Sequence, residues 1–340
     1  MDDRVADLPD GRLALPLTMS PTPAPAWHQS VMGPEVFQHL NPRPGTTIVD
    51  GTVGTGGHSL MILPHILPTG RLVAIDCDQT ALQLARKRLT EFEPHVTFVQ
   101  ENYRHLATIL QGVGISRVDG VLLDLGMSSL HVDCAERGFS FSKEGPLDMR
   151  MDPRQGATAE VLVNQLRLDE LAMIFETFGE ERFAKRIANR IVEARRVHPI
   201  TTTTQLARLV VEAVPPPRGH RRLHPATRIF QALRMAVNDE SRALADVLGT
   251  VSELLKPGGR LVILTFHSLE DRLVKHAFAQ GLRDGAWTVL TKKPVRPSEE
   301  ELARNPRARS AKLRAVEQRS GQRAQGSGQL PAPKSLNPER

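Results

Sequence analysis

The sequence predicts an α/β protein in which a doubly wound parallel sheet carries an inserted helical segment. Three observations predict this fold. An apolar strand that ends in Asp50 runs straight into a glycine-rich turn, and further apolar runs with polar ends follow at strand–helix–strand intervals. More than a hundred residues, whose later part has helical periodicity, then separate Asp124 from the next strand at 260–266.

The first strand and its turn read IVDGTVGTGGHS over residues 48–59 and contain four glycines. Such a turn allows positive φ angles and lets the backbone approach a bound ligand closely. A dinucleotide fingerprint would place its third glycine where Ser59 stands. Asp50 would repel a pyrophosphate but attract the sulfonium and ammonium groups of S-adenosylmethionine. The turn therefore favours S-adenosylmethionine, although glycine-rich surface turns also occur without a ligand.

The second strand, 71–76, ends in Asp76 at the interval where a carboxylate reaches the ribose hydroxyls of a nucleoside ligand. An alternative role exists for this part of the chain. Asp76 and Asp78 precede a helix expected over 80–89, and either carboxylate suits a helix N-cap. One of the two can cap the helix while the other binds the ligand.

The third strand, 96–99, leads to Tyr103, and the fourth, 118–123, ends in Asp124. Parallel strands present their carboxyl ends at one edge of the sheet, where ligands bind. The sequence therefore predicts one crevice that contains residues 54–58, Asp76, Tyr103 and Asp124.

Beyond Asp124, helical spacing recurs over 171–178 and 183–192, and a capped helix over 201–214 ends at Pro215. The segment 225–255 is expected to return to the sheet as helix. A turn at 256–259 then precedes the fifth strand, and 287–291 is a late strand.

Composition limits the class of protein. The 340-residue chain has no apolar run of membrane-spanning length. Its N-terminus is acidic and then proline-rich, unlike a secretory signal or a transit peptide. Two cysteines, Cys77 and Cys134, are too few for a disulfide framework or a zinc site. A soluble protein of the cytoplasm is expected, with no membrane and no metal site.

The basic charge is concentrated in two segments. Residues 182–234 hold 12 basic and 2 acidic groups, and residues 292–340 hold 12 and 5, which leaves −11 for the rest of a chain of net charge +6. Segregation of this kind suits a protein that binds a polyanion with one part and a cationic cofactor with another, although arginine-rich helices can simply be solvated. The candidate nucleic-acid contacts are Arg182, Lys185, Arg186, Arg190, Arg195, Arg196, Arg221, Arg222, Arg228, Arg307, Arg309, Lys312 and Arg314.

The predicted organisation has four parts. These are a flexible extension over 1–27, a discontinuous cofactor-binding domain over 28–133 and 226–313, an inserted helical RNA-recognition domain over 134–225, and a disordered basic tail over 314–340.

The chain resembles the MraW or RsmH methyltransferases from about residue 28 to 313. The blocks that carry the resemblance are HQSVM (28–32), DGTVGTGGHS (50–59), LLDLGMSS (122–129), RGFSF (137–141), GPLDMRMD (145–152), GEERFAKRIA (179–188), HPATRIFQALRMAVNDE (224–240), PGGRLVILTFHSLEDR (257–272) and NPRARSAKLR (305–314). The resemblance implies a Rossmann-like class I S-adenosylmethionine-dependent methyltransferase with an inserted helical domain. Its implied substrate is the N4 of a cytidine in the decoding region of 16S rRNA, in the small ribosomal subunit or an assembly intermediate. The sequence leaves both a monomer and a homodimer open.

The cofactor contacts implied by the resemblance are Gly56, Gly57, His58, Asp76, Tyr103, Asp124 and His131. Two positions depart from the family form, which usually has Phe at position 103 and Pro-Gln at positions 130 and 131. Tyr103 is a mild change, whereas His131 replaces a neutral amide with an ionisable imidazole.

Asp124 is the candidate catalytic residue, because a carboxylate there would meet a target amine beside the methyl group. An equal alternative is that Asp124 binds only the cofactor and has no catalytic role. Ser128 or Ser129 would fix the edge of the base, His267 and Ser268 form a second candidate pair, and Phe139, Phe141 or Phe266 would hold an extruded base. Methylation at cytosine C5 would instead require a cysteine thiolate, and neither cysteine is well placed for it.

Three rival functions remain on sequence alone. A nicotinamide-dependent oxidoreductase shares the glycine turn, but fails at Ser59 and leaves the arginine clusters unexplained. A noncatalytic ribosome-assembly factor of the same fold would have no need of intact Asp50, Gly56, Asp76 and Asp124. A methyltransferase acting on another RNA would keep both the glycine turn and the arginine clusters.

Overall fold

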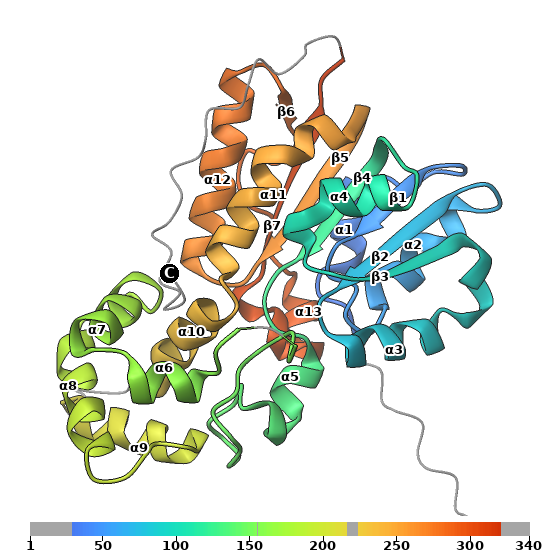
Figure 1. The fold of residues 1–340 in the computed structure, drawn as a ribbon. Helices are drawn as coiled ribbons and strands as arrows, with labels where there is room; N and C mark the ends of the chain where they lie inside the picture. Colours follow the sequence, from blue (N-terminus) through green and yellow to red (C-terminus); the bar gives the residue numbers. More distant parts are fainter. Residues whose placement is uncertain (1–28, 155, 216–223, 321–340) are drawn as a thin grey trace, which may run out of the picture.

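A computed structural model describes residues 29–154, 156–215 and 224–320 of the chain. A seven-stranded sheet with the strand order β3-β2-β1-β4-β5-β7-β6 lies at its centre (Figure 1). The parallel strands are β1 (Thr47–Asp50), β2 (Arg71–Asp76), β3 (Val96–Gln100), β4 (Val118–Asp124) and β5 (Leu255–Thr265). β7 (Lys312–Gln318) is antiparallel to both β5 and β6 (Trp287–Val289). The predicted α/β fold is confirmed.

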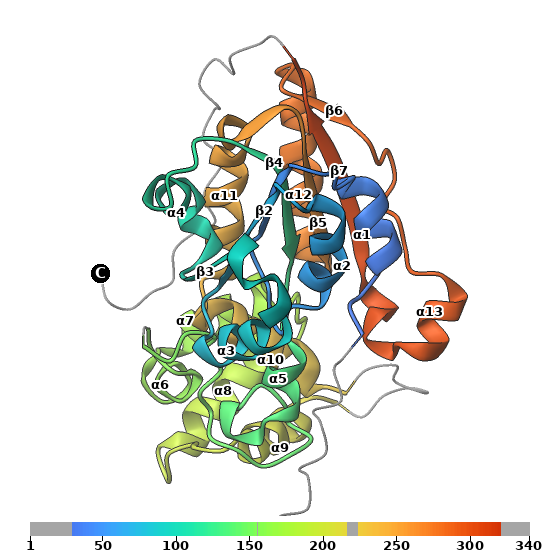
Figure 2. The same ribbon diagram turned by 90° about the vertical axis from the view of Figure 1, so that its right-hand side faces the viewer.

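Helices cover both faces of the sheet, as Figure 2 shows. One face packs against α4 (Leu106–Gly112), α11 (Glu240–Leu254) and α12 (Ser268–Arg283), and the other against α1 (Gly33–Leu40), α2 (Gly57–Ile66) and α3 (Gln79–Arg88). Successive strand residues therefore enter opposite cores: Val121 and Leu123 belong to the first, and Leu122 to the second. Burial on both faces explains why these strands read as continuous apolar runs.

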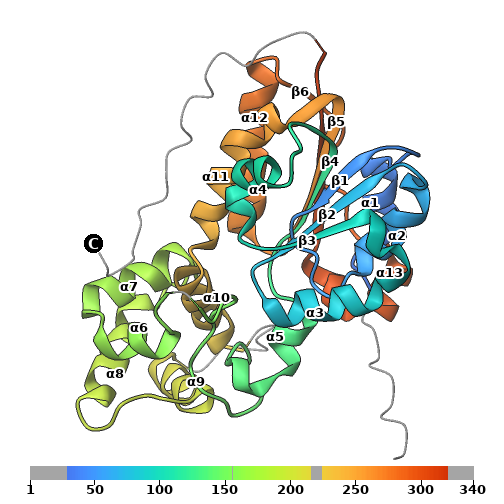
Figure 3. The same cartoon turned by 45° about the vertical axis from the view of Figure 1, so that its right-hand side comes forward.

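Five helices form a separate lobe with its own hydrophobic core (Figure 3). They are α6 (Ala159–Gln165), α7 (Leu168–Thr177), α8 (Ala184–Arg195), α9 (Thr203–Ala213) and α10 (Ala226–Val237). We expected the return to the sheet to begin at residue 226, but α10 packs in the lobe and only α11 covers the sheet. The boundary lies at Asp239, whose φ of 48° turns the chain between two helices with similar periodicity. The sequence has no glycine or proline to mark it.

The expected start of the disordered tail, residue 314, is too early. Residues 312–318 form β7 in the interior of the sheet, where Leu313, Ala315 and Val316 are buried. Before it come α13 (Glu299–Arg304) and the short helix η4 (Pro306–Ser310). Lys312, Arg314 and Glu317 alternate with these apolar residues, so a buried strand reads as a basic segment. The expectations for residues 1–27 and 321–340 lie outside the described residues.

Short elements complete the path between β4 and the lobe. α5 (Ser129–Asp133) follows β4, and the single turn η3 (Ala135–Arg137) follows α5. η1 (Thr90–His95) and η2 (Tyr103–His105) flank β3. Across the described ranges, every helix is too short or too polar to span a membrane.

Candidate active site

A pocket of about 860 Å³ lies at the carboxyl ends of the parallel strands. Its lining includes six of the seven predicted cofactor contacts: Gly57, His58, Asp76, Tyr103, Asp124 and His131. Gly56 is not among the residues that line the pocket, and its contact with the cofactor stays a prediction. Gly56 has a φ of 81°, and a Cβ atom there would lie 3.3 Å from Leu89 Cγ. Its role is to let α2 pack closely on α3.

Asp76 faces the pocket and is held by backbone amides. Gly54 N donates to Asp76 Oδ2 at 2.9 Å, and Asp78 N donates to Asp76 Oδ1 at 2.9 Å. Burial raises the pKa of Asp76. The N-cap of α3 is Asp78 instead, whose Oδ1 accepts from Thr80 N at 2.8 Å. Asp78 therefore caps the helix, and Asp76 is left facing the pocket.

Asp50 lies beneath the glycine turn and does not line the pocket. It is 1% exposed, and Ser59 Oγ donates to its Oδ2 at 2.7 Å. Burial raises the pKa of Asp50 to about 6, although the Ser59 hydrogen bond opposes the change. The expectation that Asp50 attracts the ligand directly is therefore wrong. Ser59, at the position of the third fingerprint glycine, anchors this buried carboxyl group.

Asp124 and His58 form the floor of the pocket. Asp124 N donates to Thr52 Oγ1 at 2.6 Å, and His58 Nε2 lies 3.4 Å from Asp124 Oδ2. Among the described residues, Asp124 Oδ1 and both ring nitrogens of His58 have no hydrogen-bond partner of good geometry. Burial lowers the pKa of His58, but hydrogen bonding and charge from Asp124, with the charge of Asp50, raise it overall. Asp124 thus lines the pocket and has one carboxylate oxygen that no described residue engages.

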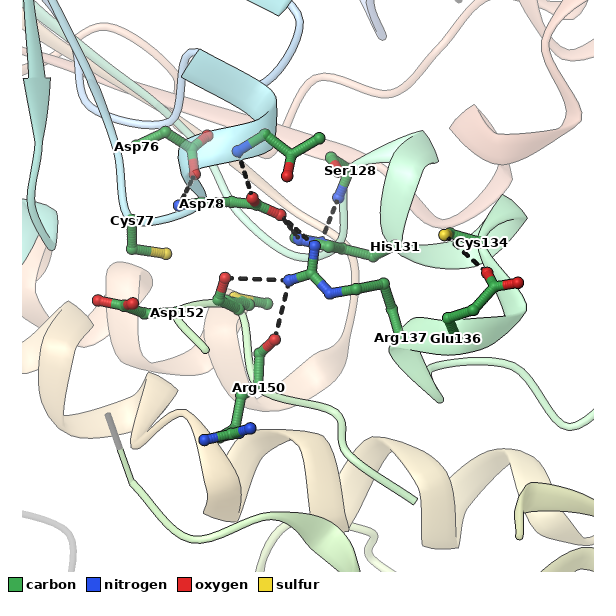
Figure 4. A network of polar contacts seen from close by, with 12 residues as sticks. Asp76, Cys77, Asp78, Ser128, His131, Cys134, Glu136, Arg137, Arg150 and Asp152 are labelled. Atoms are coloured by element: carbon green, nitrogen blue, oxygen red, sulfur yellow. Dashed lines mark hydrogen bonds and ion pairs between the residues drawn. The ribbon is translucent and has the colours of Figure 1, made fainter. Parts of the chain in front are cut away.

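His131 contacts Asp78, which lies two residues after the end of β2 (Figure 4). Its Nε2 contacts Asp78 Oδ2 at 2.9 Å, and its ring stacks on Phe139 at 4.6 Å between centroids. Arg137 donates to the same oxygen of Asp78 at 2.7 Å. Burial raises the pKa of Asp78, but hydrogen bonds from His131 and Arg137 outweigh it and bring the pKa below its usual range. The imidazole that departs from the family form is therefore balanced by a carboxylate.

Only one of the three candidate base-holding phenylalanines lines the pocket. Phe266 does so, close to Gly126. Phe139 is 6% exposed, and Phe141 packs on Phe230 at 5.1 Å within the lobe. Tyr103, the single tyrosine, lines the pocket and packs against the core of the sheet.

A cluster of charged residues missed by the sequence reasoning lines the inner end of the pocket. Arg234 donates to both carboxylate oxygens of Glu240 at 2.8 Å. His267 Nε2 lies 3.0 Å from Glu270 Oε1, and Glu270 Oε2 accepts from Phe266 N. Arg234, Glu240 and Glu270 belong to the blocks RMAVNDE and HSLEDR, and the only signal in the sequence is the presence of charged residues in these two blocks.

The second candidate pair, His267 and Ser268, has structural roles. His267 Nδ1 accepts from Glu270 N at 3.4 Å and caps α12, while Ser268 Oγ donates to Glu180. In the described part of the chain, Glu240, His267 and Glu270 bring ligand atoms within 4.8 Å of one another. Because Arg234 engages both oxygens of Glu240, we interpret the group as an ion-pair cluster.

Residues 25–319 match the sequence profile of the MraW methylase family. The chain belongs to the MraW methylase family. It is 48% identical over 304 residues to the Syntrophotalea carbinolica protein named "Ribosomal RNA small subunit methyltransferase H", covering 85% of this chain and 97% of that one. A Pelobacter propionicus protein of the same name is 48% identical over 306 residues, covering 85% and 98%. Aeropyrum pernix fibrillarin with natively bound S-adenosyl-L-methionine gives a TM-score of 0.38 at 9% identity, covering 81% of this chain and 67% of that chain.

MraW methylases depend on S-adenosylmethionine, and the pocket residues fit this cofactor. Asp76, fixed by two amides, suits the ribose hydroxyls at the end of β2. Asp76 and Asp124 also give the pocket a negative wall that attracts a sulfonium and an ammonium group.

The cysteines of this MraW methylase are poor candidates for a thiolate. Burial, with the charges of Asp76 and Asp78, raises the pKa of Cys77. Cys134 is exposed and donates to Glu136 Oε2 at 3.0 Å, which raises its pKa. Both thiols therefore favour the protonated form.

Several of the candidate RNA contacts are engaged within the protein. Arg195 donates to Val163 O and Leu166 O at 2.6 Å, Arg228 donates to Glu180 O, and Arg190 pairs with Glu212. Lys312 and Arg314 both pair with Asp271 beside the sheet. Arg307 is exposed but pairs with Asp133. Exposed basic side chains on and beside α8 are Arg182, Lys185, Arg186 and Arg196, and Arg309 is exposed on η4. Arg221 and Arg222 lie outside the described residues.

Proposed function

We propose that this protein transfers the methyl group of S-adenosylmethionine to the exocyclic N4 of a cytidine in the decoding region of 16S rRNA. The single observation that carries the proposal is Asp124, whose buried Oδ1 has no partner among the described residues and whose Oδ2 lies beside His58. The names of the relatives support the small-subunit RNA as the substrate class. Such a reaction belongs in the cytoplasm, where the subunit or its assembly intermediate is available.

The chemical difficulty is the nucleophile, because the N4 lone pair of cytosine is delocalised into the ring. Bound S-adenosylmethionine supplies an electrophilic methyl group. Asp124 accepts a hydrogen bond from the N4 amine and draws the lone pair out of conjugation. Fixing the amine in line with that methyl group removes the entropy of encounter from the barrier. Asp124 is suited to this task because its own amide is anchored by Thr52.

His58 supports Asp124 electrostatically. The pKa of His58 is raised by the carboxylates around it, so the imidazolium form is favoured. A cation 3.4 Å from Oδ2 interacts favourably with the carboxylate of Asp124 inside the pocket. The proton released from the methylated amine has Asp124 as its first acceptor.

The neighbouring residues argue against other chemistries. A cytosine C5 methyltransferase needs a thiolate, and both thiols have raised pKa values. A nicotinamide-dependent reaction needs a pyrophosphate beside the glycine turn. In this protein Ser59 stands at the position of the third fingerprint glycine and forms a buried hydrogen bond with Asp50.

RNA recognition is assigned to the lobe and to the segment before β7. Lys185 and Arg186 are exposed on α8, and Arg309 is exposed on η4. Exposed cations of this kind contact phosphates without reading sequence, so selection of the target cytidine falls to the pocket.

The test is methyl transfer from S-adenosylmethionine to small ribosomal subunits that lack the modification, with product nucleosides resolved by mass spectrometry. We expect N4-methylated cytidine from the wild-type protein. Cofactor binding without any methylated nucleoside would favour a noncatalytic assembly factor. Methylation of another RNA, but not of the subunits, would overturn the substrate assignment.

A further inference from the structure

Arg137 lies where three separate parts of the chain meet (Figure 4). Its Nη1 donates to Asp78 Oδ2 at 2.7 Å, and its Nη2 donates to Arg150 O at 3.0 Å and Met151 O at 3.1 Å. Asp78 follows β2 of the cofactor domain, whereas residues 150 and 151 precede the lobe helices. One guanidinium therefore joins the two halves of the molecule.

On one side, Arg137 is connected to the residue that faces the ribose site. Asp78 donates its backbone N–H to Asp76 Oδ1, and the other oxygen of Asp76 accepts from Gly54. Asp78 is 1% exposed, and its side chain also contacts His131 and Thr80 N. A displaced Asp78 would leave a buried carboxylate unpaired and would disturb the amide that holds Asp76.

On the other side, Arg137 is connected to the lobe. Met151 N donates to Asn238 Oδ1 at 2.7 Å, and Asn238 Nδ2 donates to Met149 O at 2.8 Å. Asn238 is the C-cap of α10, the helix that packs in the core of the lobe. Met151 and Asn238 also line the pocket, so the lobe forms part of the pocket wall.

We propose that Arg137 is a positioning residue that couples cofactor binding to the placement of the helical lobe, so that cofactor and RNA bind cooperatively. This inference rests on the proposed function, because it assigns the cofactor to the pocket and the RNA to the lobe. Arg137 itself does not line the pocket, so it acts through Asp78 and the loop at 150–151.

The geometry gives this coupling a physical basis. A planar guanidinium can serve the carboxylate and the two carbonyls at once, which a lysine ammonium on a flexible stem does less well. A ligand that fixes Asp76 restrains Asp78, and through Arg137 it restrains the loop that contacts Asn238. The lobe then loses less conformational freedom when RNA binds, so RNA binds more tightly. Because the coupling is reciprocal, each ligand raises the affinity for the other by the same factor.

The test measures the affinity of unmethylated small ribosomal subunits with and without saturating S-adenosylhomocysteine, which binds as a cofactor analogue but transfers no methyl group. We expect the analogue to tighten subunit binding about tenfold in the wild-type protein. In Arg137→Gln the tightening should fall below about twofold, and in Arg137→Lys to about threefold, because lysine keeps the charge but loses the fork. Arg154→Gln is the matched control, since it removes an exposed ion pair with Asp152 from the same loop and should keep the tenfold effect.

A second readout does not depend on RNA. The analogue should slow hydrogen exchange of the Met151 amide in the wild-type protein and leave it unchanged in Arg137→Gln. If that variant does not fold, Arg137→Lys decides on both readouts. Full coupling in folded Arg137 variants would overturn the inference. Binding of both ligands to the wild-type protein without coupling would also overturn it while the proposed function stands, whereas failure of the wild-type protein to bind either ligand would overturn both.

Discussion

His58 Nε2 lies 3.4 Å from Asp124 Oδ2, although the two residues come from different elements, the first turn of α2 and the end of β4. The pair is assembled because β1 and β4 are neighbours in the sheet and the glycine turn directs α2 across their carboxyl ends. Its consequence is that a carboxylate oxygen and an imidazole nitrogen lie next to each other in the lining of the pocket.

Asp124→Ala should lower kcat about 1000-fold, because the group that orients and then deprotonates the amine is lost. Asp124→Asn should retain more activity, with a loss of about 100-fold, since the amide still hydrogen-bonds but carries no charge. Single-turnover methylation of small subunits measures both rates. Asp169→Asn, on the exposed start of α7, is the control, and near-normal turnover in Asp124→Ala would refute the role.

The rate should depend on pH through His58. Its pKa in the folded protein is raised above 6.5, so the imidazolium supports Asp124 at lower pH and this support is lost as pH rises through the raised value. The wild-type kcat should therefore decline at alkaline pH. His58→Gln should be about tenfold slower below pH 7 and lack that decline. His65→Gln, at the exposed end of the same helix, should keep the wild-type profile.

Asp50→Asn should stabilise the fold at neutral pH. Burial raises the pKa of Asp50 from 3.8 to about 6, so the folded state favours the protonated form and loses stability as pH rises between those values. Asparagine resembles the protonated acid, and its amide can still meet Thr52 N and Ser59 Oγ. Urea unfolding should give a gain of about 2 kcal/mol at pH 7.5 and almost none at pH 3.5. An equal gain at both values would contradict this account.

The sequence predicted most of the sheet and six of the seven pocket contacts, because strands buried on both faces and a glycine turn leave strong local patterns. What it missed depends on partners distant in the chain. Asp50 has the sequence position of a ligand-facing acid, but Ser59 binds it in the interior. Arg314 has the sequence pattern of an RNA contact, but it pairs with Asp271.

Boundaries were missed for a related reason. α10 and α11 share one helical periodicity, and only the left-handed Asp239 separates a lobe helix from a sheet helix. Likewise, Arg234 and Glu270 lie more than thirty residues apart in the sequence, and spacing alone does not show that their charges influence one another at the pocket wall.

The exposed cations on α8 should carry part of the affinity for RNA. Lys185 and Arg186 are both exposed, and no ion pair engages either of them among the described residues. The double variant Lys185→Gln, Arg186→Gln should weaken subunit binding about tenfold at 0.1 M salt and reduce the slope of log K against log salt by about 1.5. Affinity for S-adenosylhomocysteine should not change. Arg167→Gln, whose side chain already pairs with Asp169 on the lobe surface, should leave the slope near the wild-type value. A slope unchanged in the double variant would place the RNA on a different face of the lobe.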